Sequence, residues 1–227
     1  MKVKSLFLGD VRFQFKYGFY FIYLFFSILY IGLLFALPRM WREKAAVIMI
    51  FTDPSAMGLY FMGSMVLFEK SERVLNSIAV SPVKPWEYVI SKLFSIGLIS
   101  SVVSLAIGIP AGIVINPFFF IFGVFLCSCL FSAVGLMIAC KITTLNQFIL
   151  ATIPAEILIN VPALIWLFWY KKSWLLVHPG VCIMTLCSGE GAPLPALLVL
   201  FFWAVLFTVL ACGTVKKMLR SVGGVKL

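Results

Sequence analysis

The stretch EKSERVLNSIAVSPVKPWEYVISK, residues Glu69–Lys92, is a polar island between two apolar runs. It holds seven of the 26 charged residues, in a chain of which only 11% of residues are charged. Hydrophobic residues make up 63% of the 227 residues, and the mean hydropathy is +1.13. A soluble domain is about half apolar and about one quarter charged. No soluble fold of this size could bury so much apolar surface, so we expect lipid to surround most of the chain.

Apolar segments on both sides of the island match the length of about 20 residues that a membrane helix requires. There are six of them: Gly18–Leu37, Pro54–Phe68, Trp86–Ile115, Phe118–Ala139, Phe148–Trp169 and Leu194–Val215. The second is short because Asp53-Pro54 is typical of a helix start, and we expect Ala45–Phe51 to fold against it as a non-spanning segment. The sequence therefore predicts an all-α polytopic membrane protein with about six transmembrane helices. We expect residues 1–227 to form a single transmembrane domain.

Lysine and arginine are unevenly distributed over the predicted loops. If the N-terminus is inside, 13 of the 18 basic residues lie on the inner side. The positive-inside rule then places both termini and the island, residues 69–85, in the cytoplasm. Attraction to anionic lipid of the inner leaflet explains the net charge of +10. We expect no nucleic-acid partner, because no basic stripe lies on a soluble face.

Residues 1–17 predict an interfacial helix that lies on the inner membrane surface. Its expected apolar face comprises Val3, Phe7, Leu8, Val11 and Phe15, and its polar face comprises Ser5, Arg12 and Lys16. Lys4, Asp10 and Gln14 interrupt this pattern, and a disordered basic tail is the alternative.

The outer loop, residues 170–193, contains two apolar stretches that are too short to span, with the turn His178-Pro179-Gly180 between them. We expect two short re-entrant helices that are buried in protein. Cys182 and Cys187 could form a disulfide on this side. The alternative is that they are small apolar fillers, like the four cysteines in the predicted membrane helices.

Within the island, Val74, Leu75, Ile78 and Ala79 recur at helical spacing before Ser81-Pro82 ends the pattern. This predicts one short amphipathic helix of about two turns. A second helix begins at Pro85, with Glu87 in its first turn. The apolar face of the short helix requires a partner. The partner is either another protein or the chain's own membrane helices.

The island resembles the cytoplasmic loop of type-2 permeases of ATP-binding cassette exporters, in particular bacterial permeases described as fluoroquinolone or multidrug exporters. The residues that carry the resemblance are Glu69-Lys-x-Glu72-Arg73-x-Leu75, Val80-Ser81-Pro82-Val83, Glu87-Tyr88 and Ser91-Lys92. The stretch Asp53-Pro54, Gly58, Gly63 and Leu67 also resembles the start of the second membrane helix of that family. One residue departs from the pattern: Arg73 stands where the family commonly has glycine.

The resemblance implies that the island is a coupling helix that docks into a groove on a separate ATPase subunit. Val74, Leu75, Ile78 and Ala79 would fill the groove. Glu69, Glu72 and Arg73 would line its rim or pair with the ATPase, and Pro82 belongs to the same coupling motif. Two ATPase subunits and a second permease copy, identical or related, are the implied partners.

The chain offers little for catalysis of its own. It lacks the Gly-x-x-x-x-Gly-Lys-Ser/Thr run that cradles nucleotide phosphates, and it has one histidine, His178. One histidine gives a metal site or a catalytic triad almost nothing to build on. We therefore expect a non-enzyme with no catalytic residue, no metal ligand and no cofactor. ATP and Mg²⁺ would bind to the partner ATPase.

Glu156 is the one carboxylate deep within a predicted membrane helix, and Asn160 follows one turn later. A charge at the middle of the bilayer costs about 2.5–3.5 kcal/mol, and such residues usually face the interior of a bundle. One interpretation is that both residues line a substrate pathway and attract a cationic or zwitterionic amphiphile. The other is that Glu156 is protonated, or paired with a neighbouring helix, and only holds the bundle together.

Together these features predict the permease subunit of an ATP-driven exporter of hydrophobic or amphipathic small molecules, drugs or antibiotics. Export of a lipid or a peptide is one alternative, and a membrane assembly or regulatory subunit that transports nothing is another. An ion-coupled secondary transporter would show inverted repeats, and we find none that is convincing.

Overall fold

The computed structural model describes residues 2–52, 57–169, 171–189 and 191–222. Over these ranges the regular structure is entirely helical, without a β-strand, which confirms the predicted all-α class. The helices are α1 (Lys2–Lys16), α2 (Phe19–Ala36), α3 (Arg39–Thr52), α4 (Gly58–Ser71), α5 (Val74–Val80), α6 (Pro85–Ala111), α7 (Pro117–Lys141), α8 (Leu145–Phe168), η2 (Ser173–Val177), α9 (Pro179–Ser188) and α10 (Pro193–Val222).

Five helices, α2, α6, α7, α8 and α10, are long and apolar enough to cross a membrane. They match five of the six predicted spans, and the chain is a polytopic membrane protein. The remaining predicted span corresponds to α4, which has 14 residues and is as short as expected. Its predicted start at Asp53-Pro54 lies outside the described residues.

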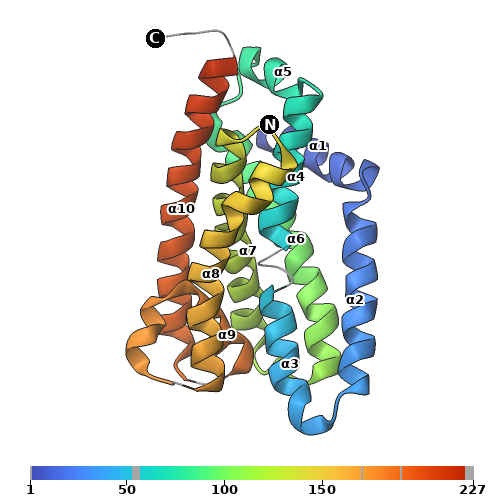
Figure 1. Cartoon of the computed structure of the whole chain (residues 1–227), viewed down its shortest axis with the longest axis vertical. Coiled ribbons are helices and arrows are strands. Elements are labelled where there is room, and N and C mark those ends of the chain that lie inside the picture. Colours follow the sequence, from blue (N-terminus) through green and yellow to red (C-terminus); the bar gives the residue numbers. More distant parts are fainter. Residues whose placement is uncertain (1, 53–56, 170, 190, 223–227) are drawn as a thin grey trace.

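The two short helices α3 and α4 meet near the middle of α7. At the end of α3, Phe51 lies against Phe131 of α7, with ring centroids 6.2 Å apart. At the start of α4, the Gly58 carbonyl accepts a hydrogen bond from Ser132 of α7 at 3.2 Å. Because neighbouring residues of α7 contact both ends, α3 and α4 follow one another along the bundle, as Figure 1 shows.

This arrangement corrects one prediction. Ala45–Phe51 does not fold against the second membrane helix. Instead, α3 packs on α6, α9 and α2. Its buried residues, Ala46, Val47, Ile50 and Phe51, form one face of the helix. Each of the two helices is about 21 Å long at 1.5 Å per residue, so the pair covers the bilayer when stacked.

The central helices are α6 and α7, and α4 is locked onto α7. A Cβ atom added to Gly135 of α7 would lie 2.4 Å from the Leu59 carbonyl oxygen of α4, so glycine is needed for this close approach. Ser128 of α7 also donates to Ser100 of α6 at 2.9 Å. By contrast, only 22% of the apolar window of each of α2, α8 and α10 is buried, so these helices leave much of their surface to lipid or another chain.

The outer loop contains two short helices, η2 and α9, as predicted. Nearly all of α9 is buried against α7, α8, α10 and α3. Protein burial of this kind is what a re-entrant segment requires. The thiols of Cys182 and Cys187 are free and buried, so the disulfide alternative is wrong and the cysteines act as small apolar fillers. Cys182 donates instead to the Leu176 carbonyl.

The helix α1 lies across the end of the bundle at which α5 and the last turns of α10 also lie (Figure 1). We call this the α5 end. The predicted helix in residues 1–17 is confirmed, and Val3, Phe7 and Val11 of its expected apolar face are half-buried. Phe15 is 75% exposed, whereas Asp10 and Gln14 are buried against α6. The two polar residues that interrupt the amphipathic pattern therefore mark the side on which α1 docks.

Candidate functional site

The predicted short amphipathic helix of the island forms where the sequence predicts it, as α5, Val74–Val80. It begins after Arg73, whose backbone is in the left-handed region with φ 58° and ψ 19°. Left-handed backbone is costly for residues that carry a Cβ and free for glycine. This geometry gives the physical reason for the glycine that the resembled family commonly has at this position.

The apolar face of α5 packs on the chain itself. Leu75 is only 1% exposed, and α5 contacts α10 and α4. Ile78 and Ala79 are half-buried against the same core, and Val74 is half-buried as well. The expectation that Leu75 fills a groove on another protein is therefore wrong, because α5 lies flat on its own membrane helices and uses this face to cover them.

The opposite face of α5 is open. Arg73, Asn76, Ser77 and Val80 recur at intervals of three, one and three residues, and all are exposed. This spacing makes one stripe along the helix. Val80 is 83% exposed, an unusual position for a β-branched apolar side chain. We call these four residues the outer stripe of α5.

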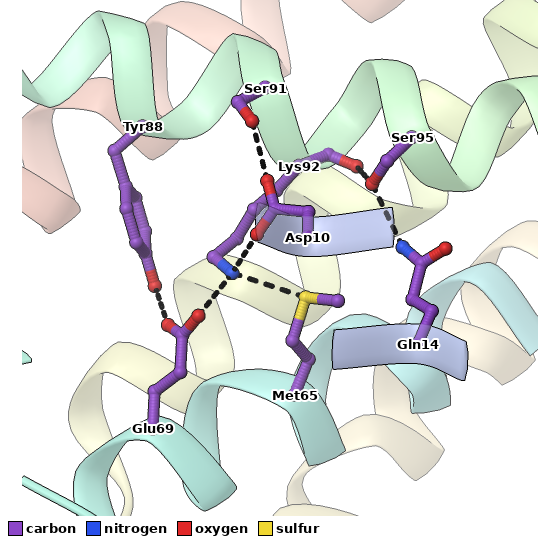
Figure 2. A network of polar contacts seen from close by, with 8 residues as sticks. All are labelled: Asp10, Gln14, Met65, Glu69, Tyr88, Ser91, Lys92 and Ser95. Carbon is purple, nitrogen blue, oxygen red and sulfur yellow. Dashed lines mark hydrogen bonds and ion pairs between the residues drawn. The ribbon is translucent and has the colours of Figure 1, made fainter. Parts of the chain in front are cut away.

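Residues 69–85 join α4 to α6 through α5, and we call this segment the elbow. Glu69, its first residue, is only 5% exposed. Its carboxylate accepts one bond from Lys92 Nζ at 2.6 Å and one from the Tyr88 hydroxyl at 2.5 Å. Figure 2 shows this arrangement. The prediction that Glu69 lines the rim of an ATPase groove is wrong, because the adjoining turn of α6 encloses the side chain.

Lys92 also binds Asp10 of α1, at 2.9 Å, and is itself 1% exposed. The second Asp10 oxygen accepts from Ser91, and Gln14 one turn later donates to Ser95 at 2.9 Å (Figure 2). Two carboxylates thus share one ammonium group. We call Asp10, Glu69, Tyr88, Ser91 and Lys92 the ion cluster. It joins α1, α4 and α6.

The residues that follow Glu69 hold the elbow to further elements. Lys70 Nζ donates to the carbonyls of Ala139, Cys140 and Ile142 at 2.6, 3.1 and 2.7 Å, which caps the end of α7. The Tyr17 hydroxyl, between α1 and α2, donates to Glu72. This hydrogen bond raises the pKa of the Tyr17 phenol.

The predicted pathway residues lie on α8, away from the ion cluster. Glu156 and Asn160 are half-buried. Tyr60 of α4 interacts with Glu156 and with Thr152, one turn earlier on α8. Within the described part of the chain, Glu156 Oε1 and Asn160 Oδ1 are buried acceptors without a hydrogen-bond donor. Two such acceptors four residues apart on one helix could accept bonds from a cation, an amine or water.

Across the described ranges, no group of three histidine, cysteine or acidic side chains could hold a metal ion. Among the described residues, the two candidate functional sites are the ion cluster and the acceptor pair on α8. Sequence reasoning found the second of these and missed the first, although Asp10 and Gln14 on an otherwise apolar face were a visible signal.

Comparisons with known proteins agree on one family. A family model described as "Fluoroquinolones export permease protein family" matches residues 2–222. Two proteins named "Fluoroquinolones export permease protein", from Mycobacterium tuberculosis strains CDC 1551 / Oshkosh and ATCC 25618 / H37Rv, are each 27% identical to this chain over 138 residues. The matched stretch covers 60% of this chain and 58% of each relative.

Proposed function

Since the chain belongs to the fluoroquinolones export permease protein family, we propose that it is the membrane subunit of an ATP-driven exporter. It moves hydrophobic or amphipathic small molecules, drugs or antibiotics, out across the cytoplasmic membrane of a bacterium or archaeon. Both termini and α5 face the cytoplasm. Separate ATPase subunits bind ATP and Mg²⁺, since no phosphate-binding loop occurs in this sequence.

The observation that carries this proposal is the open outer stripe on a firmly held short helix. Beneath α5, Glu69 and Lys70 are bound to α6 and α7, so a force applied to the stripe reaches two central helices. Docking of an ATPase on Arg73, Asn76, Ser77 and Val80 would use this connection. Closure of two ATPase subunits then moves the helices between inward- and outward-facing states.

The same proposal assigns Glu156 and Asn160 to the cargo pathway. Five long helices in the described part of one chain are too few to enclose a pathway, and α8 exposes much of its surface. A second permease copy, identical or related, completes the pathway. The unpaired acceptors on α8 then meet polar groups of an otherwise apolar cargo.

The test is reconstitution. The chain is purified from its host membranes with whatever protein carries a phosphate-binding loop, placed in vesicles, and supplied with ATP and fluorescent amphiphiles. We expect ATP-dependent transport, and we expect Val80→Asp to abolish ATPase binding. Ser221→Asp places the same charge on an exposed site of α10 at the same end and leaves binding intact.

Other outcomes decide against the proposal. An ATPase that binds while only lipid or peptide moves would change the cargo class. A chain that binds no ATPase and transports nothing would be an assembly or regulatory subunit.

A further inference from the structure

The proposed docking of an ATPase on α5 does not explain one feature of the α5 end, the packing of α1 on α6. The helix α1 contributes nothing to the outer stripe, yet it buries two polar side chains, Asp10 and Gln14, against α6. Burial of a carboxylate is costly unless it is paired and hydrogen-bonded. Both Asp10 oxygens have partners, Lys92 and Ser91, so the contact is specific.

We propose that α1 is a second coupling element, and that Asp10 is the positioning residue that ties it, through Lys92, to Glu69 at the base of the elbow. This inference rests on the proposed function, because it concerns how ATPase closure reaches the membrane helices. Motion of α5 is transmitted through Glu69 of α4 to Lys92 of α6, and from Lys92 to Asp10 of α1.

The geometry of Lys92 makes it the centre of this connection. Its Nζ lies 2.9 Å from Asp10 and 2.6 Å from Glu69, and it is almost inaccessible to solvent. Separation of either carboxylate from Lys92 would break an ion pair to an ammonium group that is only 1% exposed, which is unfavourable. The ends of α1, α4 and α6 that meet here therefore move as one unit.

Charge balance indicates that Asp10 does more than neutralise Lys92. Glu69 alone would neutralise the ammonium group, and Tyr88 already satisfies the second Glu69 oxygen. The second carboxylate gives the cluster an excess negative charge, which is a cost for a site that needs only neutrality. Its contribution is position, because it brings α1 into the connection.

Two further contacts on the same helix agree with this role. Gln14 donates to Ser95, one turn along α6 from Lys92. Tyr17, immediately after α1, donates to Glu72, which lies just before α5. Three side chains of one short segment thus reach residues that flank α5 on both sides. Exposed residues of α1, such as Arg12, make no part of this connection.

The first experiment measures how firmly α1 is held in the purified full-length chain, without an ATPase. Asp10→Asn leaves Lys92 and Glu69 as a neutral pair, so the fold is expected to persist. We expect amide exchange in α1 to become about tenfold faster, while exchange in α7 is unchanged. Arg12→Gln, on the exposed side of the same helix, is the matched control and leaves exchange as in the wild type. Unchanged exchange in Asp10→Asn would overturn the proposal.

The second experiment measures coupling in vesicles with the ATPase bound. We expect Asp10→Asn to keep ATPase binding and ATP hydrolysis but to hydrolyse about tenfold more ATP per molecule transported. Asp10→Glu, which keeps the charge, restores most of the coupling. A wild-type ratio in Asp10→Asn contradicts the role of α1.

Two controls keep these tests decisive. If Asp10→Asn fails to insert, Gln14→Met removes the neutral contact to Ser95 instead, and wild-type exchange and coupling in that variant would refute the inference. If the wild-type chain binds no ATPase, the proposed function fails, and the exchange measurement still decides whether Asp10 anchors α1.

Discussion

The carboxylates on the two sides of α4 differ in how many of their oxygens have hydrogen-bond partners. On the side that faces α6, all four carboxylate oxygens of Asp10 and Glu69 accept a hydrogen bond or an ion pair. On the side that faces α8, Tyr60 reaches Glu156, yet Glu156 Oε1 has no donor among the described residues. Gln14 Oε1 beside the first side also has no donor among the described residues, so the contrast concerns the carboxylates: paired carboxylates hold helices together, and an unpaired one can accept a ligand or water.

Removal of the shared cation breaks the paired side most severely. Lys92→Met leaves two carboxylates buried without a positive charge, so we expect the free energy of unfolding to fall by about 3–5 kcal/mol. Chemical unfolding of the purified chain in detergent measures the loss. Combination of Lys92→Met with Asp10→Asn and Glu69→Gln restores most of the stability. If Lys92→Met alone were as stable as the wild type, the two buried carboxylates would not depend on Lys92 for their stability.

The next test concerns the tight contact that holds α4 on α7. Gly135→Ala places a methyl carbon 2.4 Å from the Leu59 carbonyl oxygen, and backbone cannot move aside cheaply. We expect destabilisation of about 1–3 kcal/mol from overpacking. Gly213→Ala is the matched control, since a Cβ there meets nothing within 4 Å. Equal stability of the two variants would mean that α4 is held loosely on both sides.

The open side of α4 is tested by transport rather than stability. Glu156→Gln removes a charge whose second oxygen is unpaired, so we expect assembly to remain intact and transport of cationic amphiphiles to fall about tenfold. Uncharged cargo is affected less. Glu43→Gln, at an exposed position of α3, is the control. If Glu156→Gln fails to assemble, Glu156 holds the bundle together and the two sides of α4 are alike.

Local signals in the sequence predicted much of this molecule. The five long spans were recognisable from apolar length alone. At the start of α7, the Asn116 side chain caps the Phe118 amide, which is two residues away. The start of α6 at Pro85 was also predicted, and the Glu87 carboxylate accepts from the Lys84 amide there. Each of these features depends on residues that are close in sequence.

The remaining features depend on residues that are far apart. Asp10 and Lys92 are separated by 82 positions, and no periodicity links them. The apolar face of α5 looks the same whether it covers another protein or α10, so the sequence left both alternatives open for Leu75. Glu69 illustrates the same limit. Its place in a polar loop suggested exposure, whereas the packing of α1 and α6 buries it.

The smallest expected effect concerns Arg73, which lies between the end of α4 and the start of α5. It is the one non-glycine residue with positive φ in the described ranges. Arg73→Gly removes the steric cost of left-handed backbone, so we expect a gain of about 1 kcal/mol in the free energy of unfolding. Arg73→Ala keeps that cost and gives no gain. Both variants lose the same guanidinium from the outer stripe. Equal ATPase binding by the two variants would assign any binding defect to the lost charge. Better binding by Arg73→Gly would assign part of the defect to backbone strain.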